Sequence, residues 1–380
     1  MPVKSIKFNL TLKGHGVVQT DGQEQGSAMV YKRGDVSMAA AFDKHGQLLK
    51  NIVWAKGNFE RYLDEEGKTR LRKILKISGD GLRHAIHREA MPANTPSILL
   101  SPESCIFATA SLDMLIRGWL SLSKSMEGRK RSAYTITAAE APDAQLNLEL
   151  FANSAPKTKK SESSDEAKDE PRDTSLFARE TTGDTCYNAT GFIDVEELRF
   201  ISVSDIYGRR AISDDMAELY RAQLSENLGS EVDVPRYWKR KNGSSNIPER
   251  GILLDNAQVS RLILHLLKGM ANIHIVKSAS GFAQTSELTI FPLKDANYAP
   301  CDGVKVFDGN VFNSSVIPTS FVSPWEEITE EEGRARVETI EAAIAANKKE
   351  RKETKAGRGS KNKGKQGAPE TTAEDTSDEE

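Results

Sequence analysis

The sequence predicts an α+β fold, with a sheet covered mainly on one side by helices. Polar and apolar residues alternate at 5–12, which is the period of a strand with one buried face. Apolar residues recur at helical spacing in 108–122 and after Asp255, and strand-like patterns return in 190–202. Strands and helices therefore alternate irregularly along the chain, with long excursions between them, as in α+β domains.

The N-terminal part of the chain is predicted to contain a long excursion between its first strand and its first helix. Two glycines in 13–16 predict a turn after the opening strand. Residues 21–56 show little periodicity and are expected to be irregular. The other elements predicted here are a basic helix, an apolar core helix and an extended segment, at 76–91, 108–122 and 132–137.

The C-terminal part is predicted to hold the rest of the core, with charged segments before and after it. Lys, Ser, Asp and Glu dominate residues 154–175, which lack the apolar side chains needed to order them. The predicted elements that follow are a strand-like segment, a polar helix, a helix with a broad apolar face and two strands, at 190–202, 214–228, from Asp255, 273–276 and 288–290. The predicted organisation is a domain over 1–325 with an irregular excursion at about 21–70 and a disordered insert at about 153–176, a solvated helix at 326–346 and a disordered basic-then-acidic tail at 347–380.

Composition restricts the classes of function. The 380 residues are 38% hydrophobic, enough to supply a core, and their formal net charge of −3 argues against a uniformly basic binder. The charge is uneven, since 68–88 is strongly basic and the end of the chain is acidic. Three separated cysteines without a CxxC pattern argue against a disulfide framework or a zinc site, and we see no signal peptide or bilayer-length apolar run. We expect a cytoplasmic protein with no cofactor and no metal.

Residues 76–91 combine a helix start signal with a cationic side. Ser78 or Asp80 can cap the first turn. Gly79 and Gly81 would let backbone N–H groups approach an anion there. Opposite the apolar side of the helix lie four cationic or titratable residues, Arg83, His84, His87 and Arg88. The pattern predicts a phosphate-binding helix; the alternatives are a solvated face, or a metal site at the two histidines, for which no third ligand is evident.

A second candidate segment, 236–241, mixes aromatic and basic residues. Such a mixture is typical of a loop that stacks on a base while neutralising phosphate. The alternative is an exposed basic loop with Trp238 packed into a core. Residues 129–131 and Arg117 are candidates of second rank, since the first could be a solvated turn and the second an internal ion pair.

Five segments between about residues 6 and 290 share their order and spacing with one protein family. They are KGHGVV, ISGDGLRHAIHRE, LDMLIRGWL, ETTGDTCYNATGFIDVEELRFIS and GILLDNAQVSRLILHLL. Together they resemble the Cas seven-type backbone subunit (RAMP superfamily) of CRISPR Cascade complexes, and within it the minimal variant of type I-F. The resemblance does not extend to residues 21–70, to the charged insert or to the C-terminal tail.

The resemblance implies a modified RRM-like, or ferredoxin-like, palm with finger, web and thumb insertions. It also implies a non-catalytic subunit that oligomerises along the guide RNA, holds it independently of sequence and leaves its bases free to pair with target DNA. The implied partners are guide (CRISPR) RNA, target DNA through the guide, further copies of the chain and other Cascade subunits, with no membrane. The predicted RNA-binding residues are Lys13, His15, Lys76, Arg83, His84, His87, Arg88, Arg117, Arg129, Lys130, Arg131, Arg236, Tyr237, Trp238, Lys239, Arg240 and Lys241.

Two other classes of function remain open. A RAMP-type endoribonuclease would process guide RNA or cleave target RNA, with His15 as a general base or with Asp35, Asp43 or Asp184 at a cleavage site. Nothing in the sequence singles out any of these residues, since no carboxylate pair or nucleophile triad accompanies them. An RRM-type regulator would instead read a few bases with aromatic residues on its sheet, although the RNP1 signature is missing.

Overall fold

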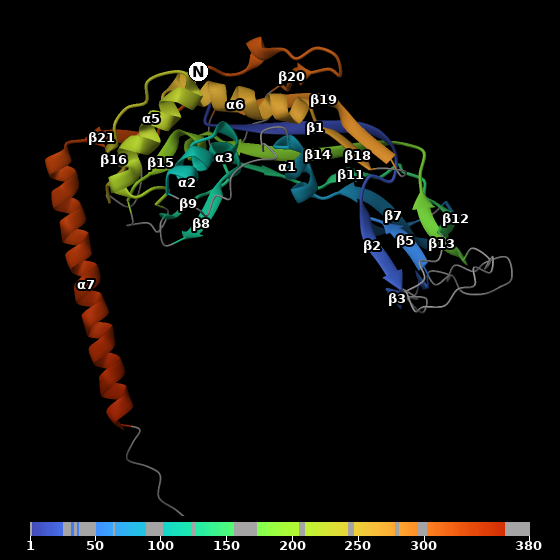
Figure 1. Ribbon diagram of the computed structural model, residues 1–380, viewed down its shortest axis with the longest axis horizontal. Coiled ribbons are helices and arrows are strands. Elements are labelled where there is room, and N and C mark those ends of the chain that lie inside the picture. The colour runs from blue at the N-terminus through green and yellow to red at the C-terminus, as the bar shows by residue number, and fades with distance from the viewer. Residues whose placement is uncertain are drawn as a thin grey trace, which may run out of the picture. The chain divides into compact units, whose positions relative to one another are not determined.

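The computed structural model describes residues 2–25, 32–33, 36–37, 51–63, 65–88, 102–123, 126–155, 173–204, 210–241, 247–277, 281–294 and 302–361 (Figure 1). The chain divides into two compact units, residues 1–235 with 251–324 and residues 236–250 with 325–380. The first unit contains the large sheet and most of the helices. The second contains a pair of antiparallel strands and the C-terminal helix. The mixed α/β architecture agrees with the predicted class.

The centre of the large sheet is the N-terminal strand. This strand, β1 (Ser5–Gly16), is antiparallel to both of its neighbours, β14 (Asp184–Asp194) and β19 (Gly281–Leu293). Alternate residues of 5–12 are buried, which confirms the predicted strand. The strand continues through 13–16, where a turn was predicted, because Gly14 allows close approach of the neighbouring strand. A Cβ at Gly14 would lie only 2.1 Å from the carbonyl oxygen of Phe282.

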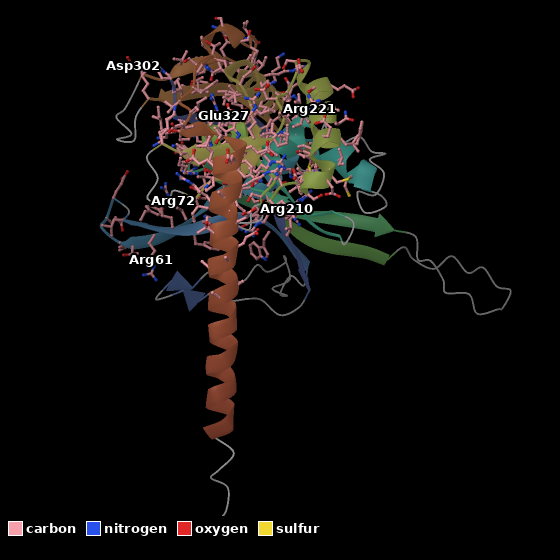
Figure 2. All side chains as sticks on the ribbon, turned by 90° about the vertical axis from the view of Figure 1, so that its left-hand side faces the viewer. Arg61, Arg72, Arg210, Arg221, Asp302 and Glu327 are labelled. Carbon is pink, nitrogen blue, oxygen red and sulfur yellow. The ribbon has the colours of Figure 1, made fainter. Side chains whose placement is uncertain are left out.

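In the described residues the large sheet has nine strands, in the order β18-β19-β1-β14-β11-β7-β6, with β10 beside β14 and β20 beside β19. The bounds of the outer strands are β6 (Gly57–Leu63), β7 (Thr69–Ile77), β10 (Tyr134–Ile136), β11 (Ala139–Ala141), β18 (His274–Lys277) and β20 (Val304–Phe307). The strand β6 lies where an irregular excursion was predicted, and its hairpin partner β7 continues beyond that segment; Figure 2 shows Arg61 and Arg72 on this hairpin. Arg72 pairs with Glu60 across the hairpin at 2.7 Å, so polar cross-strand contacts replace the missing apolar pattern.

Four helices contribute buried residues to one core with the inner face of β1, namely α1 (Gly79–Ile86), α2 (Pro102–Thr109), α3 (Leu112–Arg117) and α6 (Asn256–Ala271). Figure 1 shows α6 running along β19. The single helix predicted at 108–122 is wrong. Ser111 caps a new helix by accepting from Met114 N, and Gly118, at φ 76°, ends that helix, so the chain continues as a strand from Trp119.

The helix predicted from Asp255 is α6, and its start forms a capping box. The Asp255 side chain accepts from Gln258 N at 2.7 Å, and the Gln258 side chain accepts from Asp255 N at 2.9 Å. Replacing Asp255 with Ala should therefore lower the free energy of unfolding by about 1 kcal/mol, measured by urea denaturation. Asp255→Asn keeps a capping oxygen and should lose less. Equal losses in the two variants would contradict the role of the cap.

The first unit also contains a smaller sheet and several short elements. The smaller sheet has the order β12-β13-β5-β2, with bounds Asn147–Ala155, Asp173–Thr181, Asn51–Ala55 and Thr20–Gln25. The other elements are β3 (Lys32–Arg33), β4 (Val36–Ser37), β8 (Trp119–Ser123), β9 (Met126–Lys130), α4 (Val195–Arg199), β15 (Phe200–Ser202), η1 (Asp214–Met216), α5 (Ala217–Leu228) and η2 (Ser314–Val316). The strand β17 (Glu249–Leu253) has residues in both units, because the division falls after Arg250. The first and last residues of the predicted insert belong to the strands β12 and β13, and residues 156–172 lie outside the described residues.

The second unit is formed by β16 (Arg236–Arg240), β21 (Trp325–Ile328) and α7 (Glu330–Lys361). The two strands pair antiparallel. Ion pairs at i,i+4 spacing, from Arg334 to Glu330 and from Arg336 to Glu332, support the first turns of α7. The helix continues to Lys361, past residue 347 where a disordered tail was predicted, and 362–380 lie outside the described residues.

Candidate nucleic-acid interface

Helix α1 begins where two segments of the chain supply its N-terminal hydrogen bonds. Ser78 is the N-cap, and its Oγ accepts from Gly81 N at 3.2 Å. The Gln19 side chain accepts from Ser78 N at 2.7 Å and donates to its Oγ. Gly79 lies close to the backbone of β10, where a Cβ would be 2.8 Å from the carbonyl oxygen of Ile136. The predicted Ser78 cap is confirmed, but the predicted anion cradle is not, because Gly81 donates to the cap and Gly79 serves close packing.

The two sides of α1 differ as predicted, with one exception. Leu82 and Ile86 are buried, whereas His84 and Arg88 are exposed. His87 was predicted on the cationic side, yet it is only 2% exposed. It is the C-cap, with φ −102° and ψ 7°, so helical spacing no longer decides where its side chain lies. The predicted contact of His87 with RNA is therefore wrong.

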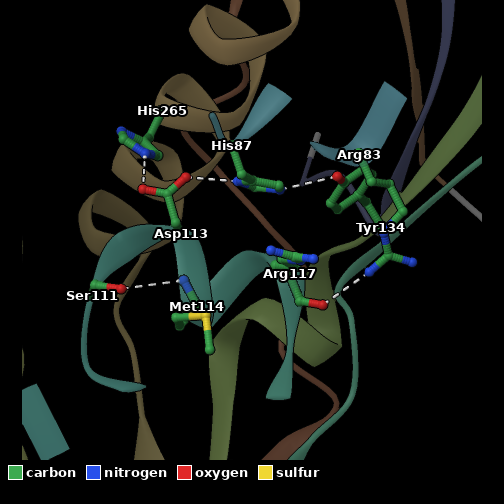
Figure 3. Close-up of polar contacts among 8 residues, drawn as sticks. All are labelled: Arg83, His87, Ser111, Asp113, Met114, Arg117, Tyr134 and His265. Carbon is green, nitrogen blue, oxygen red and sulfur yellow. Dashed lines mark hydrogen bonds and ion pairs between the residues drawn. The ribbon is translucent and has the colours of Figure 1, made fainter. Parts of the chain in front are cut away.

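His87 belongs to a chain of hydrogen bonds that joins α6, α3, α1 and β10 (Figure 3). Asp113 on α3 bonds to His87 Nδ1 at 2.6 Å and to His265 Nε2 on α6 at 3.0 Å. The other nitrogen of His87, Nε2, lies 3.0 Å from the hydroxyl of Tyr134 on β10. We call these four residues the His–Asp–His–Tyr network. Asp113 and Tyr134 are 9% and 1% exposed, so the network satisfies polar groups that would be costly to leave unpaired.

Burial and the contacts of the network shift the pKa values of Asp113 and Tyr134. Burial alone would raise the pKa of Asp113, but hydrogen bonds from His265 and His87 outweigh burial and lower the pKa to about 2. Burial raises the pKa of Tyr134 to about 12, against the opposing positive charge of Arg83. At neutral pH the carboxylate of Asp113 only accepts, so His87 Nδ1 donates to it. The Tyr134 hydroxyl keeps its proton at neutral pH and lies within hydrogen-bond distance of His87 Nε2.

Arg83 lies beside the end of this network. Its Nη2 donates to the carbonyl oxygen of Arg117 at 3.0 Å and to Ser132 Oγ at 3.1 Å. Its guanidinium carbon lies 5.3 Å from the centroid of the Tyr134 ring, a cation–π contact. The guanidinium is therefore held by one ring and two acceptors, and it has more N–H donors than these two hydrogen bonds use.

Two further arginines lie close to Arg83 at the end of α3. Gly118 follows Arg117, and a Cβ at Gly118 would be 2.6 Å from the carbonyl oxygen of Lys130 and 2.5 Å from Ser132 N. This close approach brings residues 130–132 against the end of α3. We define the basic cluster as the three arginines gathered here together with one exposed residue of α1 and one that follows the helix, namely Arg83, Arg117, Arg131, His84 and Arg88. Arg131 is exposed, and Arg83 and Arg117 are partly exposed.

Residues 2–296 match the sequence model of one family, described as type I-Fv CRISPR-associated protein Cas7fv-like. The chain belongs to the Cas7fv-like family. This membership confirms the predicted resemblance to a Cas seven-type backbone subunit of CRISPR Cascade complexes.

Two solved structures are similar to this Cas7fv-like chain at low scores. A chain of a CRISPR RNA-guided surveillance complex is 10% identical, with a TM-score of 0.29, over 74% of this chain and 68% of that one. A chain of a CRISPR RNA-guided surveillance complex, pre-nicking, is 7% identical, with a TM-score of 0.32, over 75% of each chain. None of the curated proteins compared with the chain matches it. Likeness at these scores is too low to carry over contacts or roles.

Three predicted contacts of the Cas7fv-like protein lie on strands of the large sheet. Lys13 and His15 are on the exposed side of β1, and His15 Nδ1 lies 2.8 Å from Asp184 Oδ1. Lys76 is on β7, and its Nζ donates to Asn58 Oδ1 at 2.5 Å. Contact of these three residues with RNA stays a prediction.

The basic triplet at 129–131 is divided by the strand that carries its first two residues. Arg129 is exposed on β9, and Arg131 joins the basic cluster. Lys130 points the other way: it is 6% exposed, and its Nζ donates to the carbonyl oxygen of Glu197. Because strand side chains alternate between faces, the middle residue turns inward, and the predicted contact of Lys130 with RNA is wrong.

Residues 236–241 were predicted to form a loop, but they include the strand β16. Arg236 pairs with Glu327 at 2.8 Å, and Lys239 lies 3.8 Å from Glu326 on β21. The aromatic rings of this unit also have protein neighbours, since the Arg240 guanidinium lies 5.1 Å from the Trp325 ring and that of Arg250 lies 6.0 Å from the Tyr237 ring. Tyr237 and Trp238 are partly exposed, and Lys241 is exposed. The predicted loop is therefore wrong, and RNA binding by this segment stays a prediction.

Sequence reasoning missed three members of the network, Asp113, His265 and Tyr134. A signal for two of them is present. Asp113 interrupts the apolar run LDMLI and His265 interrupts LILHLL, so each places a polar group on a helix that buries apolar residues. A buried polar side chain needs a hydrogen-bond partner, so two such residues on different helices are expected to pair with each other.

The described residues show neither a metal-binding cluster nor a membrane-spanning helix. No three His, Cys, Asp or Glu side chains within these residues are grouped closely enough to hold a metal ion. Among the same residues, no helix combines the length and the apolar character needed to cross a bilayer.

Proposed function

We propose that this Cas7fv-like protein is a non-catalytic backbone subunit whose copies assemble along CRISPR guide RNA in a type I Cascade complex. The observation that carries the proposal is the basic cluster. Its central guanidinium, on Arg83, is oriented by the Tyr134 ring and by two acceptors, and the exposed side chains of His84 and Arg88 lie on or just after the same helix. Oriented guanidinium groups are suited to phosphate oxygens, to which they donate two parallel hydrogen bonds.

The cluster favours binding that is independent of RNA sequence. Its residues are four arginines and one histidine, side chains that can donate to phosphate, and phosphate contacts position a nucleic acid without reading its bases. Guide RNAs differ in their spacer, so a subunit that accepts any guide has to leave base edges unread. Recognition of target DNA then falls to base pairing with the guide.

We also propose that four strands of the large sheet form a ferredoxin-like palm. The chain order β1, helices α1 to α3, β10, β14, α6 and β19 is the strand–helix–strand–strand–helix–strand order of such folds. In the sheet, β1 lies between β19 and β14, and β10 lies outside β14. The hairpins β6–β7 and β12–β13 extend this palm and are candidates for the finger, web or thumb insertions.

Assembly on RNA of different lengths tests the proposal. The purified protein is mixed with single-stranded RNAs of unrelated sequence, and the mass of each complex is measured by analytical ultracentrifugation. We expect the number of bound copies to rise in proportion to RNA length and to be the same for all sequences. One copy on each RNA, or binding of one sequence motif only, would contradict assembly along a guide and would favour an RRM-type regulator.

One contact is compatible with the endoribonuclease alternative. His15 and Asp184 form an exposed pair at 2.8 Å, which is the geometry of a histidine oriented by a carboxylate. We nevertheless expect RNA incubated with the protein to stay intact on denaturing gels, and His15→Ala to leave assembly within about twofold of wild type, the size of one lost surface contact. RNA fragments made by the wild type and absent with His15→Ala would support the nuclease.

A further inference from the structure

The His–Asp–His–Tyr network ends at Tyr134, whose ring contacts the guanidinium of Arg83. The backbone of Tyr134 is held in β10, which pairs with β14, and its hydroxyl is held by His87 Nε2. The ring is thus fixed at both ends, and its face lies under the guanidinium of Arg83. Tyr220 is also fully buried, and its hydroxyl donates to the carbonyl oxygen of Thr109, which shows that a backbone carbonyl alone can satisfy a buried tyrosine. The network at Tyr134 therefore exceeds what burial of a hydroxyl requires.

We propose that Tyr134 is a positioning residue for Arg83, and that His87 and Asp113 keep the Tyr134 ring in place. This inference rests on the proposed function, since it requires Arg83 to bind RNA phosphate. None of the three positioning residues touches the RNA itself. Their effect is to restrict the guanidinium to one orientation before RNA arrives.

The hydrogen bonds of Ser132 form a second link between Tyr134 and Arg83. Ser132 Oγ accepts from Arg83 Nη2, donates to the carbonyl oxygen of Tyr134 at 2.8 Å and accepts from Tyr134 N at 3.4 Å. A shift of Tyr134 would therefore move both the ring and the hydroxyl that contact Arg83. An arginine side chain has many rotamers, and holding it in the bound orientation reduces the entropy lost on binding.

The network also ties this position to the core of the first unit. Asp113 lies near the start of α3 and His265 lies on α6, the helix that packs along β19. The charge on Asp113 persists at neutral pH because its pKa is lowered to about 2, so the hydrogen bond that holds His87 is charge-assisted. Arg83 is therefore supported by three helices and a strand rather than by a mobile loop.

A double-mutant cycle tests the inference. Affinity for a single-stranded RNA is measured for wild type, Tyr134→Leu, Arg83→Ala and the double variant, together with thermal unfolding of each. We expect Tyr134→Leu to weaken binding about three- to tenfold, the range of a partly desolvated cation–π contact, and to have no further effect in the Arg83→Ala background. Tyr134→Phe keeps the ring but loses the hydrogen bond to His87, so its affinity should lie between those of wild type and Tyr134→Leu; wild-type affinity in this variant would show that His87 and Asp113 do not hold the ring.

Two additional variants keep the test decisive. If Tyr134→Leu does not fold, Ser132→Ala removes one acceptor from Arg83 and should weaken binding about twofold, again only when Arg83 is present. Tyr62→Leu is the matched control, because Arg72 lies 5.6 Å from the ring of Tyr62 on the β6–β7 hairpin. We expect it to leave RNA affinity unchanged.

The outcomes separate the inference from the proposed function. A loss of affinity with Tyr134→Leu that persists in the Arg83→Ala background, or an equal loss with Tyr62→Leu, would overturn the positioning role. Loss of binding with Arg83→Ala but not with folded Tyr134→Leu or Ser132→Ala would overturn it while leaving the proposed function intact. Wild-type affinity in Arg83→Ala itself would remove both the positioning role and the phosphate contact on which it rests.

Discussion

Replacing Asp113 with Ala should lower the free energy of unfolding of the first unit by about 3 kcal/mol. The carboxylate accepts hydrogen bonds from His87 and His265, and the His87 ring is 2% exposed. Without Asp113, the buried Nδ1–H group of His87 loses its acceptor, whereas the more exposed His265 can turn to solvent. The loss is measured by urea denaturation followed by circular dichroism.

Asp113→Asn is the matched control for this prediction. Its carbonyl oxygen still accepts from His87 Nδ1, and its amide can donate to His265 once that ring changes tautomer. We expect Asn to lose about half as much stability as Ala, since it keeps the geometry and removes the charge. Identical stability of wild type and Asp113→Ala would mean that the network contributes nothing to folding.

The same residue predicts a dependence on acid. The folded state lowers the pKa of Asp113 from 3.8 to about 2, so ionised Asp113 stabilises the fold at every pH above about 4. As the pH falls from about 4 to about 2, the unfolded chain takes up a proton first, and this contribution of about 2 kcal/mol is lost. The difference in stability between wild type and Asp113→Asn should therefore shrink over that range. A constant difference would contradict the lowered pKa.

The sequence predictions are accurate where neighbouring residues in the sequence determine the structure. Helix α6 could be predicted because its apolar spacing runs over 16 residues and its capping box is formed by neighbours in sequence. The helix predicted at 108–122 contains a similar apolar spacing, but a serine cap and a glycine at positive φ divide it. Both residues can be read in the sequence, but whether they start and end a helix depends on the strand that follows them.

Buried cations and histidines mark a second limit of sequence-based prediction. His87 and Lys130 have the composition of a phosphate-binding surface, and both are in the interior, where each meets an oxygen from a distant segment. Asp113 is 26 positions from His87 in sequence, and Glu197 is 67 positions from Lys130. A pattern of charges along one segment indicates which residues can bind an anion, but not whether the anion is RNA or another part of the same chain.

Polar strands mark a third limit. The strands β6 and β16 carry mainly charged and aromatic residues, so neither shows the alternation that identifies a half-buried strand. They are strands because a partner strand pairs with them, and in β16 that partner, β21, lies far away in sequence. Context of this kind overrides local preference in sheets more often than in helices.

Replacing both Arg83 and Arg88 with Ala should weaken assembly on RNA of every sequence. If each arginine neutralises one phosphate of a single strand, the double variant releases two fewer counterions on binding. The plot of log affinity against log salt concentration should then be less steep by about 1.4, from about 0.7 for each phosphate. Affinity at low salt should fall at least about tenfold, measured by fluorescence anisotropy over a range of potassium chloride concentrations.

The matched control removes two exposed cations that have acidic partners. Arg72 pairs with Glu60 and Lys305 with Glu287, so Arg72→Ala with Lys305→Ala changes the net charge by the same amount at positions already neutralised. If long-range attraction by net charge were the cause, both double variants would flatten the salt dependence equally. If the basic cluster binds phosphate directly, only the Arg83 and Arg88 variant will do so, because counterion release counts the phosphates contacted rather than the charge of the whole protein. An unchanged slope in that variant would show that α1 does not contact the RNA backbone.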